Sequence, residues 1–315
     1  MTRPALQQRV LRFIEEGGDF EALALALHRH QFAHDPIIRA LCAAPAASLP
    51  AIPAVPVGLF RELDVGTVEP EEPHQAFHTS GTTVGRPGVH RVRDTVLYDA
   101  GCLAWAQRWL PDTRATIGLM AESGHSSLAH MVRLFAPHTG PVQFLLRDED
   151  LDLAPLARVE EPVFICATSF ALDLWLSSAP AALPAGSAIM VTGGFKGRSH
   201  SLDADALIQA AQRLAPVLLE YGMTELSSQL WARPGEPYAP PPWLRVQAVD
   251  PLTGATLPAE QPGQLRFMDL CNLDSTVHIE TLDQGIVHAD GRVSLLGRLP
   301  DAPARGCSLA VEDLL

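Results

Sequence analysis

Apolar residues recur at helical intervals near the start of the chain. Over residues 4–14 and 19–31 they return every three or four positions, at Leu6, Val10, Phe13, Ile14, Leu23 and Leu27. This spacing predicts two helices, and Asp19 is a suitable N-cap for the second. Between Ala43 and Val57 the sequence is rich in Ala and Pro. Because proline lacks a backbone donor and fixes φ, we expect an extended connector there.

The middle of the chain alternates short apolar runs with helical patterns. Runs rich in β-branched residues predict strands at Thr116–Ala121, Val142–Leu146, Val163–Thr168, Ala188–Thr192 and Val217–Glu220. The segments with helical spacing predict helices at Thr95–Leu110, Phe170–Ser177 and Asp203–Leu214. This alternation is typical of βαβ units. We therefore expect an α/β fold with a mostly parallel sheet covered by helices on both faces.

After Trp231 the pattern changes to short strands separated by turn signals such as Asp290-Gly291. The predicted strands are Leu244–Val249, Gly263–Asp269, Thr276–Thr281, Ile286–Ala289 and Val293–Leu296. A small antiparallel β subdomain is the expected result. We thus predict one domain over 1–315, made of a helical arm and connector (1–57), an α/β core (58–231) and a β subdomain with a tail (232–315).

Composition and charge narrow the class of protein. The chain has 315 residues, 47% of them hydrophobic, with 23 Lys and Arg against 36 Asp and Glu, a formal charge of −13. No basic run could follow a phosphate backbone, so nucleic acid is not an expected partner. No stretch approaches the roughly 20 apolar residues of a membrane span. Five cysteines without CxxC spacing indicate neither a disulfide framework nor a zinc site, and a cytoplasmic location is expected.

Two motifs carry candidate chemistry. Residues 77–88, FHTSGTTVGRPG, form a hydroxyl- and glycine-rich stretch whose N–H and O–H donors could surround an anion. Residues 217–227, VLLEYGMTELS, run from an apolar strand into Tyr221-Gly222-Met223-Thr224-Glu225. Because ligands of open parallel sheets sit at the carboxyl ends of strands, these residues are placed for nucleotide binding. Either motif alone is also compatible with an ordinary turn.

The order and spacing of five motifs resemble those of the adenylate-forming superfamily. The motifs are TSGTT at 79–83, Gly193-Gly194, YGMTE at 221–225, Asp283 and Gly297-Arg298. Within it, the chain most resembles the LuxE-type acyl-protein synthetases, short members without the C-terminal lid domain. The similar segments are IPAVPVGLF at 52–60, HTSGTT at 78–83, SSLAHM at 126–131, TGGFKG at 192–197, EYGMTE at 220–225 and RGCSL at 305–309.

The resemblance implies ATP and Mg²⁺ as cofactors and a role for each matching residue. Those implied to surround the ATP phosphates are Thr79, Ser80, Gly81, Thr82 and Thr83. Those implied to frame adenine are Gly193, Gly194 and Tyr221, and Gly222 is a further implied cofactor-binding residue. Thr224 would meet the α-phosphate, Glu225 would bind magnesium, Asp283 would accept the ribose hydroxyls, and Arg298 would contact ribose and adenylate.

The resemblance further implies that a cysteine near the C-terminus accepts the acyl group as a thioester, and Cys307 matches it. Arg305 nearby would favour its thiolate. Two features differ from larger relatives: Arg86 is the only cation of 84–88, and no lid-domain lysine follows Arg298.

The expected activity is ATP-dependent conversion of a carboxylic acid to acyl-AMP with release of pyrophosphate, then transfer to a thiol. With only 6% aromatic residues, an aliphatic or fatty acid is preferred as substrate. The acceptor is Cys307 itself or an external carrier protein, coenzyme A or amine, and a reductase or transferase is a candidate partner. A non-catalytic nucleotide-binding subunit is a further alternative.

Three histidines, His28, His30 and His34, lie on or just past the second predicted helix. With no cysteine nearby and only Asp35 as a close carboxylate, they favour a solvated helix face over a metal site.

Overall fold

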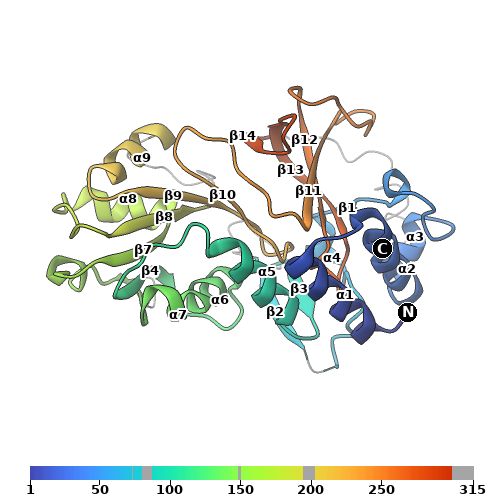
Figure 1. Ribbon diagram of the computed structural model, residues 1–315, viewed down its shortest axis with the longest axis horizontal. Helices are drawn as coiled ribbons and strands as arrows, with labels where there is room; N and C mark the ends of the chain where they lie inside the picture. The colour runs from blue at the N-terminus through green and yellow to red at the C-terminus, as the bar shows by residue number, and fades with distance from the viewer. Residues whose placement is uncertain (73, 80–86, 148–149, 194–202, 300–315) are drawn as a thin grey trace. The chain divides into compact units, whose positions relative to one another are not determined.

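The computed structural model describes the whole chain except residues 73, 80–86, 148–149, 194–202 and 300–315. The chain divides into two compact units (Figure 1). Unit 1 contains Met1–Gly101, Thr224–Ser228 and Ala239–Leu315, and unit 2 contains Cys102–Met223 and Gln229–Tyr238. These limits differ from the segments predicted from the sequence, which remain a prediction.

Unit 2 is built on a seven-stranded sheet of order β10-β9-β8-β7-β4-β5-β6. The strands are β4 (Ala115–Ala121), β5 (Val142–Arg147), β6 (Asp150–Leu151), β7 (Val163–Thr168), β8 (Ala188–Thr192), β9 (Val217–Tyr221) and β10 (Leu230–Ala232). The five central strands pair in parallel, while β10 and β6 are antiparallel edges. The expected mostly parallel sheet is confirmed.

Helices cover both faces of this sheet, α8 and α9 on one side and α6 and α7 on the other (Figure 1). The helical elements are α6 (Ser127–Leu134), α7 (Ala136–Thr139), the 3₁₀ turn η2 (Leu156–Arg158), α8 (Ser169–Ser177) and α9 (Ala204–Gln212). Ser126, Thr168 and Asp203 each accept a backbone N–H at the start of a helix. Apolar residues of β7 and β8 pack with Leu172 and Trp175 of α8 in the core.

Unit 1 contains a five-stranded sheet of order β1-β13-β12-β11, with β14 paired to β13. Its strands are β1 (Val55–Pro56), β11 (Leu244–Val249), β12 (Pro262–Asp269), β13 (His278–Val287) and β14 (Val293–Arg298). The prediction of separate strands at Thr276–Thr281 and Ile286–Ala289 was wrong. The polar stretch 283–285 looks like a turn, but pairing with β12 and β14 carries one strand through it, with a register shift between Gln284 and Gly285.

A two-stranded hairpin of β2 (Gln75–His78) and β3 (Val89–Val92) also belongs to unit 1. The sequence did not predict it, because four-residue strands containing His and Arg give no clear apolar pattern. The hairpin frames the hydroxyl-rich motif, since β2 ends just before Thr79 and β3 begins just after Gly88.

The N-terminal helices are α1 (Arg3–Glu16), α2 (Phe20–His34) and α3 (Pro36–Leu41), followed by η1 (Leu49–Ala51) and α4 (Leu59–Glu62). Asp19 caps α2 by accepting the Ala22 N–H at 3.0 Å, as predicted. The connector is not wholly without elements, because η1 and β1 lie within it. β1 pairs in parallel with β13, with Val55 opposite Ile279 and Pro56 opposite Glu280.

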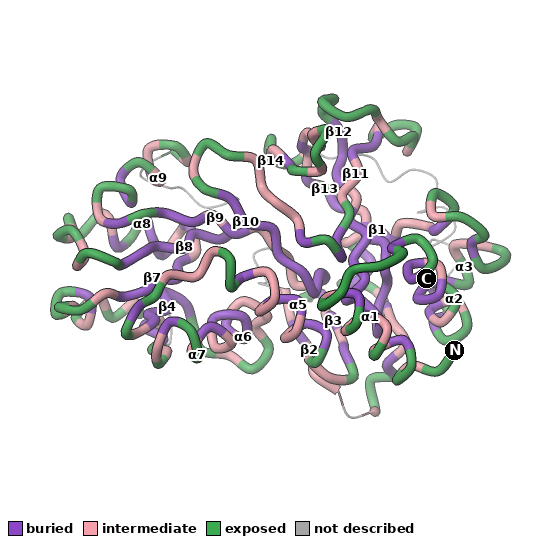
Figure 2. The backbone as a smooth tube through the Cα atoms, viewed as in Figure 1, coloured by how far each residue is buried: buried purple, intermediate pink, exposed green. Residues whose placement is uncertain are grey.

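The remaining helix of the described residues is α5 (Val96–Ala106). Buried positions follow the strands of each sheet (Figure 2). None of the described helices is both long and apolar enough for a membrane span. Cys42, Cys102, Cys166 and Cys271 are free thiols, and Cys307 lies outside the described residues.

Candidate functional site

Buried polar side chains hold the turn that contains Glu225. The Asn272 amide donates to the Glu225 carbonyl at 2.9 Å, and its Oδ1 accepts from the Ser227 N–H at 3.0 Å and the Ser227 hydroxyl at 2.7 Å. Asp269 accepts a further bond from the Ser228 hydroxyl at 2.8 Å. Because both sides of the turn are hydrogen-bonded to buried side chains, the backbone conformation at Glu225 is held in place.

His90 connects this turn to the hairpin β2–β3. Its Nδ1 lies 2.8 Å from the Thr224 carbonyl, and its Nε2 lies 2.9 Å from the Ser275 hydroxyl. Because a carbonyl can only accept, Nδ1 carries the hydrogen, and Nε2 accepts from Ser275. Burial lowers the pKa of His90 to about 4, so the imidazole is neutral at neutral pH.

The two ends of the hydroxyl-rich motif meet beside Thr224. The Thr79 N–H donates to the Gly88 carbonyl at 2.9 Å, and the Gly88 N–H donates to the Thr79 hydroxyl at 2.8 Å. The Thr224 hydroxyl lies 3.5 Å from the His78 carbonyl, at the limit of a hydrogen bond. Unit 1 therefore brings together the ends of one predicted motif and the Thr224-Glu225 part of the other. Of the motif itself, Ser80, Gly81, Thr82 and Thr83 lie outside the described residues.

The Glu225 side chain is only 5% exposed. Burial raises the pKa of Glu225 to about 7, and Asp283 adds to this effect, whereas Arg61 and Arg298 favour the carboxylate. A carboxylate held at this depth is an oxygen ligand that gains from a cation. The described residues contain no group of three or more side chains able to hold a metal by themselves.

Arg61 was missed by the sequence analysis. It lies in α4, and its Cγ would be 3.3 Å from a Cβ built on Gly88, so its stem lies against the end of the hydroxyl-rich motif. Its influence on Glu225 shows that the guanidinium is also near the turn. The only sequence signal is that Arg61 directly follows the IPAVPVGLF segment.

Asp283 and Arg298 face each other across β13 and β14. The Arg298 Nε is 3.5 Å from the Asp283 Oδ1, with the aspartate side chain 11% exposed and the arginine 49% exposed. The pair thus combines a buried acceptor with a more accessible donor, and both influence the pKa of Glu225.

The predicted adenine residues that the structure describes belong to unit 2. Gly193 directly follows β8 with φ of 82°, a conformation that favours glycine. Tyr221 ends β9, as predicted for a residue at a strand exit, and Gly222 comes next. A Cβ on Gly222 would lie 2.6 Å from Glu220 Oε1, so no side chain fits there. Gly194 lies outside the described residues.

Glu220 is a buried acid that the sequence analysis did not single out. Its carboxylate accepts a hydrogen bond from the Thr192 hydroxyl, which joins the ends of β8 and β9. Burial raises the pKa of Glu220 to about 7, although the Thr192 bond acts in the opposite direction. The sequence feature that could have revealed Glu220 is its position at the end of an apolar strand, because a buried acidic side chain requires a hydrogen-bond partner.

Searches of protein families and of curated proteins found no match to this sequence. Solved structures that share its fold include O-succinylbenzoate coenzyme A synthetase (MenE) and MatB, and the likeness confirms the expected fold class. O-succinylbenzoate coenzyme A synthetase (MenE) from Bacillus subtilis in complex with AMP superposes with a TM-score of 0.51 at 17% identity, over 71% of this chain and 49% of that one.

Two further structures agree. ATP-bound MatB from Rhodopseudomonas palustris gives a TM-score of 0.52 at 17% identity, over 71% of this chain and 47% of that one. MenE in complex with ATP and magnesium ion gives 0.52 at 16% identity, over 71% and 49%. The chain spans about half the length of these proteins. At such low identity the similarity establishes the fold, and the activity is a separate inference.

Proposed function

We propose that this protein uses MgATP to activate a carboxylic acid as an acyl-adenylate. The observation that carries the proposal is the meeting, within unit 1, of the Thr79 and Gly88 ends of the hydroxyl-rich motif with the Thr224-Glu225 turn. Structures of the same fold in complex with AMP, ATP and magnesium support it.

In this proposal Thr79, Ser80, Gly81, Thr82 and Thr83 donate to the ATP phosphates. Thr224 meets the α-phosphate, and Glu225 ligates Mg²⁺. The buried Glu225 carboxylate fits such a role, because Mg²⁺ is usually held by one or two carboxylates together with substrate phosphates. When bound, the cation neutralises charge on the phosphates. Arg61 is a further cation of unit 1 that could balance the charge near Gly88.

The nucleoside is assigned to the remaining residues. Gly193, Gly194 and Tyr221 are proposed to contact adenine, and Gly222 is a further proposed nucleotide-binding residue. A Cβ on Gly193 would meet nothing within 4 Å, which leaves room for a flat base. Asp283 is proposed to accept the ribose hydroxyls and Arg298 to donate to the ribose and adenylate oxygens. The 3.5 Å contact between Asp283 and Arg298 would keep both side chains oriented before nucleotide binds.

The substrate carboxylate would attack the α-phosphorus in line, forming a C–O–P bond and releasing pyrophosphate. Donors from residues 79–83 and Thr224 would stabilise the negative charge that spreads over the phosphate oxygens. In the finer proposal, a LuxE-type acyl-protein synthetase reaction, the Cys307 thiolate then attacks the activated carbonyl and AMP leaves. An aliphatic acid is the preferred substrate.

Carboxylate-dependent exchange of pyrophosphate into ATP tests the adenylation step. We expect exchange with at least one acid in a screen of fatty, aryl and amino acids, and Glu225→Gln should abolish it. Since glutamine removes a buried charge, this variant should unfold at the same temperature as the wild type or higher. Glu62→Gln, at an exposed position of α4, is the matched control and should retain exchange. Full exchange in Glu225→Gln would contradict the proposal.

A second experiment separates the acyl acceptors. Cys307→Ser should retain exchange but lose covalent labelling by a radioactive acid. Labelling that persists in Cys307→Ser rules out this thiol, and AMP release that depends on added carrier protein, coenzyme A or amine identifies an external acceptor. Absence of exchange with every acid would favour a non-catalytic nucleotide-binding subunit.

A further inference from the structure

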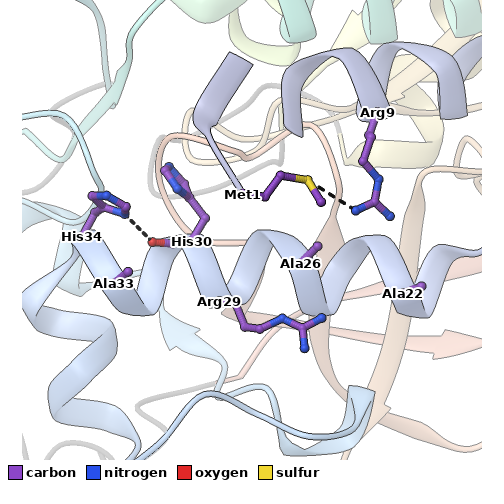
Figure 3. Close-up of a pocket in the computed structure, with 8 residues that line it drawn as sticks. All are labelled: Met1, Arg9, Ala22, Ala26, Arg29, His30, Ala33 and His34. Atoms are coloured by element: carbon purple, nitrogen blue, oxygen red, sulfur yellow. Dashed lines mark hydrogen bonds between the residues drawn. The ribbon is translucent and has the colours of Figure 1, made fainter. Parts of the chain in front are cut away.

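A cavity of about 490 Å³ lies between helices α1 and α2, and none of the residues assigned above is among its lining (Figure 3). Its volume is within the range of about 300–1,000 Å³ typical of small-molecule sites. Arg9 reaches into it from α1, and Arg29, His30 and His34 line it from α2. No acidic residue is among its lining, although the chain carries a formal charge of −13.

The cationic groups of this cavity have few internal partners. Arg9 donates to the Met1 sulfur at 3.6 Å, and neither Arg9 nor Arg29 forms an ion pair with any residue that the structure describes. In a strongly acidic protein, guanidinium groups commonly pair with carboxylates. Two guanidiniums left without one on the same cavity indicate that the cavity suits an anion.

Of the two histidines, only His30 has a ring nitrogen left over that can donate. His34 Nδ1 donates to the His30 carbonyl at 2.8 Å, which fixes the orientation of its ring. The His30 ring packs on it with centroids 4.4 Å apart. His30 Nδ1 is buried and has no hydrogen-bond partner among the described residues. A buried nitrogen of this kind normally has a partner, and an oxyanion in the cavity would supply one.

The rest of the lining is apolar, with Met1 and three alanines. Ala22, Ala26 and Ala33 share one side of α2 with the basic residues, at helical spacing. Their short side chains leave the cavity open along the helix. A ligand can therefore combine an anionic group near the arginines with an uncharged body along the alanines.

We propose that the cavity between α1 and α2 binds a small soluble phosphate monoester through Arg9, Arg29 and His30. A dianion matches the two guanidinium groups better than a carboxylate does, because each guanidinium can make two parallel bonds to phosphate oxygens. The site goes beyond the proposed adenylation and does not depend on it. The sequence expectation of a solvated histidine face agrees with His34, which is exposed, but is wrong for His28, which is buried.

Phenyl phosphate is a suitable probe, and its binding to the full-length protein is measured by titration calorimetry. We expect saturable binding that is weakened about tenfold or more by Arg9→Gln and by Arg29→Gln, the loss expected for one charge-assisted hydrogen bond. Arg12→Gln replaces an exposed arginine of the same helix outside the cavity, and should bind as the wild type does.

Several outcomes would overturn the proposal. They are absence of saturable binding, equal weakening by Arg12→Gln and Arg9→Gln, and equal affinity for benzoate and phenyl phosphate. Because Arg9 and Arg29 are not part of the core, both variants should retain the thermal unfolding midpoint of the wild type. Pyrophosphate exchange measured in the same variants should be unchanged, so failure here is distinguishable from failure of the proposed adenylation.

Discussion

At the scale of single residues, the candidate site depends on a neutral histidine, one ring nitrogen of which donates a hydrogen bond while the other accepts one. His90 donates to the Thr224 carbonyl through Nδ1 and accepts from Ser275 through Nε2. Protonation would turn the accepting nitrogen into a donor and place a charge in a buried site. His90 is therefore a positioning residue, which holds the backbone next to Glu225 without contacting the metal that we propose there.

Replacing His90 tests this role. In His90→Ala, the Thr224 carbonyl loses its donor and a cavity forms, so the free energy of unfolding should fall by about 2–4 kcal/mol. Pyrophosphate exchange should fall more than tenfold, mainly in kcat, because a mispositioned Glu225 weakens transition-state stabilisation. His90→Asn places an N–H close to the original Nδ1 and should recover part of the exchange.

His138→Ala, at an exposed position of α7, is the control and should change stability by less than about 0.5 kcal/mol. If His90→Ala is destabilised but keeps full exchange at temperatures where it is folded, His90 has a structural role only.

At the scale of elements, the parallel sheet of unit 2 depends on close packing between strands. Gly118 of β4 is in register with Phe144 of β5, and a Cβ on Gly118 would lie 2.7 Å from the Phe144 ring. The ring is only 8% exposed and has little freedom to move. The Phe144 ring can thus lie against β4 only because residue 118 has no side chain.

Gly118→Ala should lower the free energy of unfolding by about 1–3 kcal/mol, because the added methyl overpacks the sheet. Gly124→Ala is a matched control, since a Cβ there would meet nothing within 4 Å. Urea denaturation of both variants gives the comparison. Equal stability of the two variants would mean that Phe144 can adjust at no cost.

The pH dependence of folding can be tested at His278, which begins β13. Its Nδ1 donates to the Ile52 carbonyl at 2.9 Å, and burial lowers the pKa of His278 to about 4. Because the pKa is lower in the folded state than in the unfolded chain, its contribution to stability is present above about pH 6.5. That contribution is lost as pH falls from there through about 4.

The destabilisation caused by His278→Gln should therefore shrink by about 2 kcal/mol between about pH 7 and about pH 5. Burial raises the pKa of Asp35 and of Asp269 to about 6, and these groups change total stability in the opposite direction. The difference between wild type and variant, measured by urea unfolding at each pH, isolates His278. A difference independent of pH would show that its pKa is not lowered by folding.

The strands also show how much of the fold could be predicted from the sequence. Strands β7, β8 and β11 have the predicted limits. β7 and β8 are short apolar runs with clear boundaries, and β11 alternates apolar and polar residues at its start. The hairpin β2–β3 was missed, since its stability comes from pairing rather than from its own composition. β13 was divided in two because pairing on both sides overrides a polar stretch, which local sequence does not reveal.

For the candidate site, motif order predicted Thr79, Thr224, Glu225, Asp283 and Arg298, all of which lie in unit 1. The sequence could not predict His90, Asn272 or Arg61, because their importance arises from contacts between segments far apart in the chain. The separation between His90 and Thr224, for example, is 134 residues. The roles assigned to the predicted residues, including Cys307, stay predictions.

At the scale of the whole molecule, unit 1 is assembled from three separate stretches of chain. Gln31 of α2 ties two of them together. Its amide nitrogen donates to the Asn272 carbonyl at 2.7 Å, and its Oε1 accepts the Val277 N–H at 3.1 Å. Since Asn272 also holds the Glu225 turn, the N-terminal helices are an integral part of the unit that carries the predicted catalytic residues.

Gln31→Ala should therefore lower the free energy of unfolding by about 2–4 kcal/mol, because it leaves buried backbone groups without partners. Amide hydrogen exchange locates the effect: protection should fall in β11–β13 and in residues 224–228, while β7 and β8 of unit 2 keep theirs. Gln8→Ala, exposed on α1, should change neither. If β7 and β8 lose protection to the same degree, the two units unfold as one, and the N-terminal helices support the entire molecule rather than unit 1 alone.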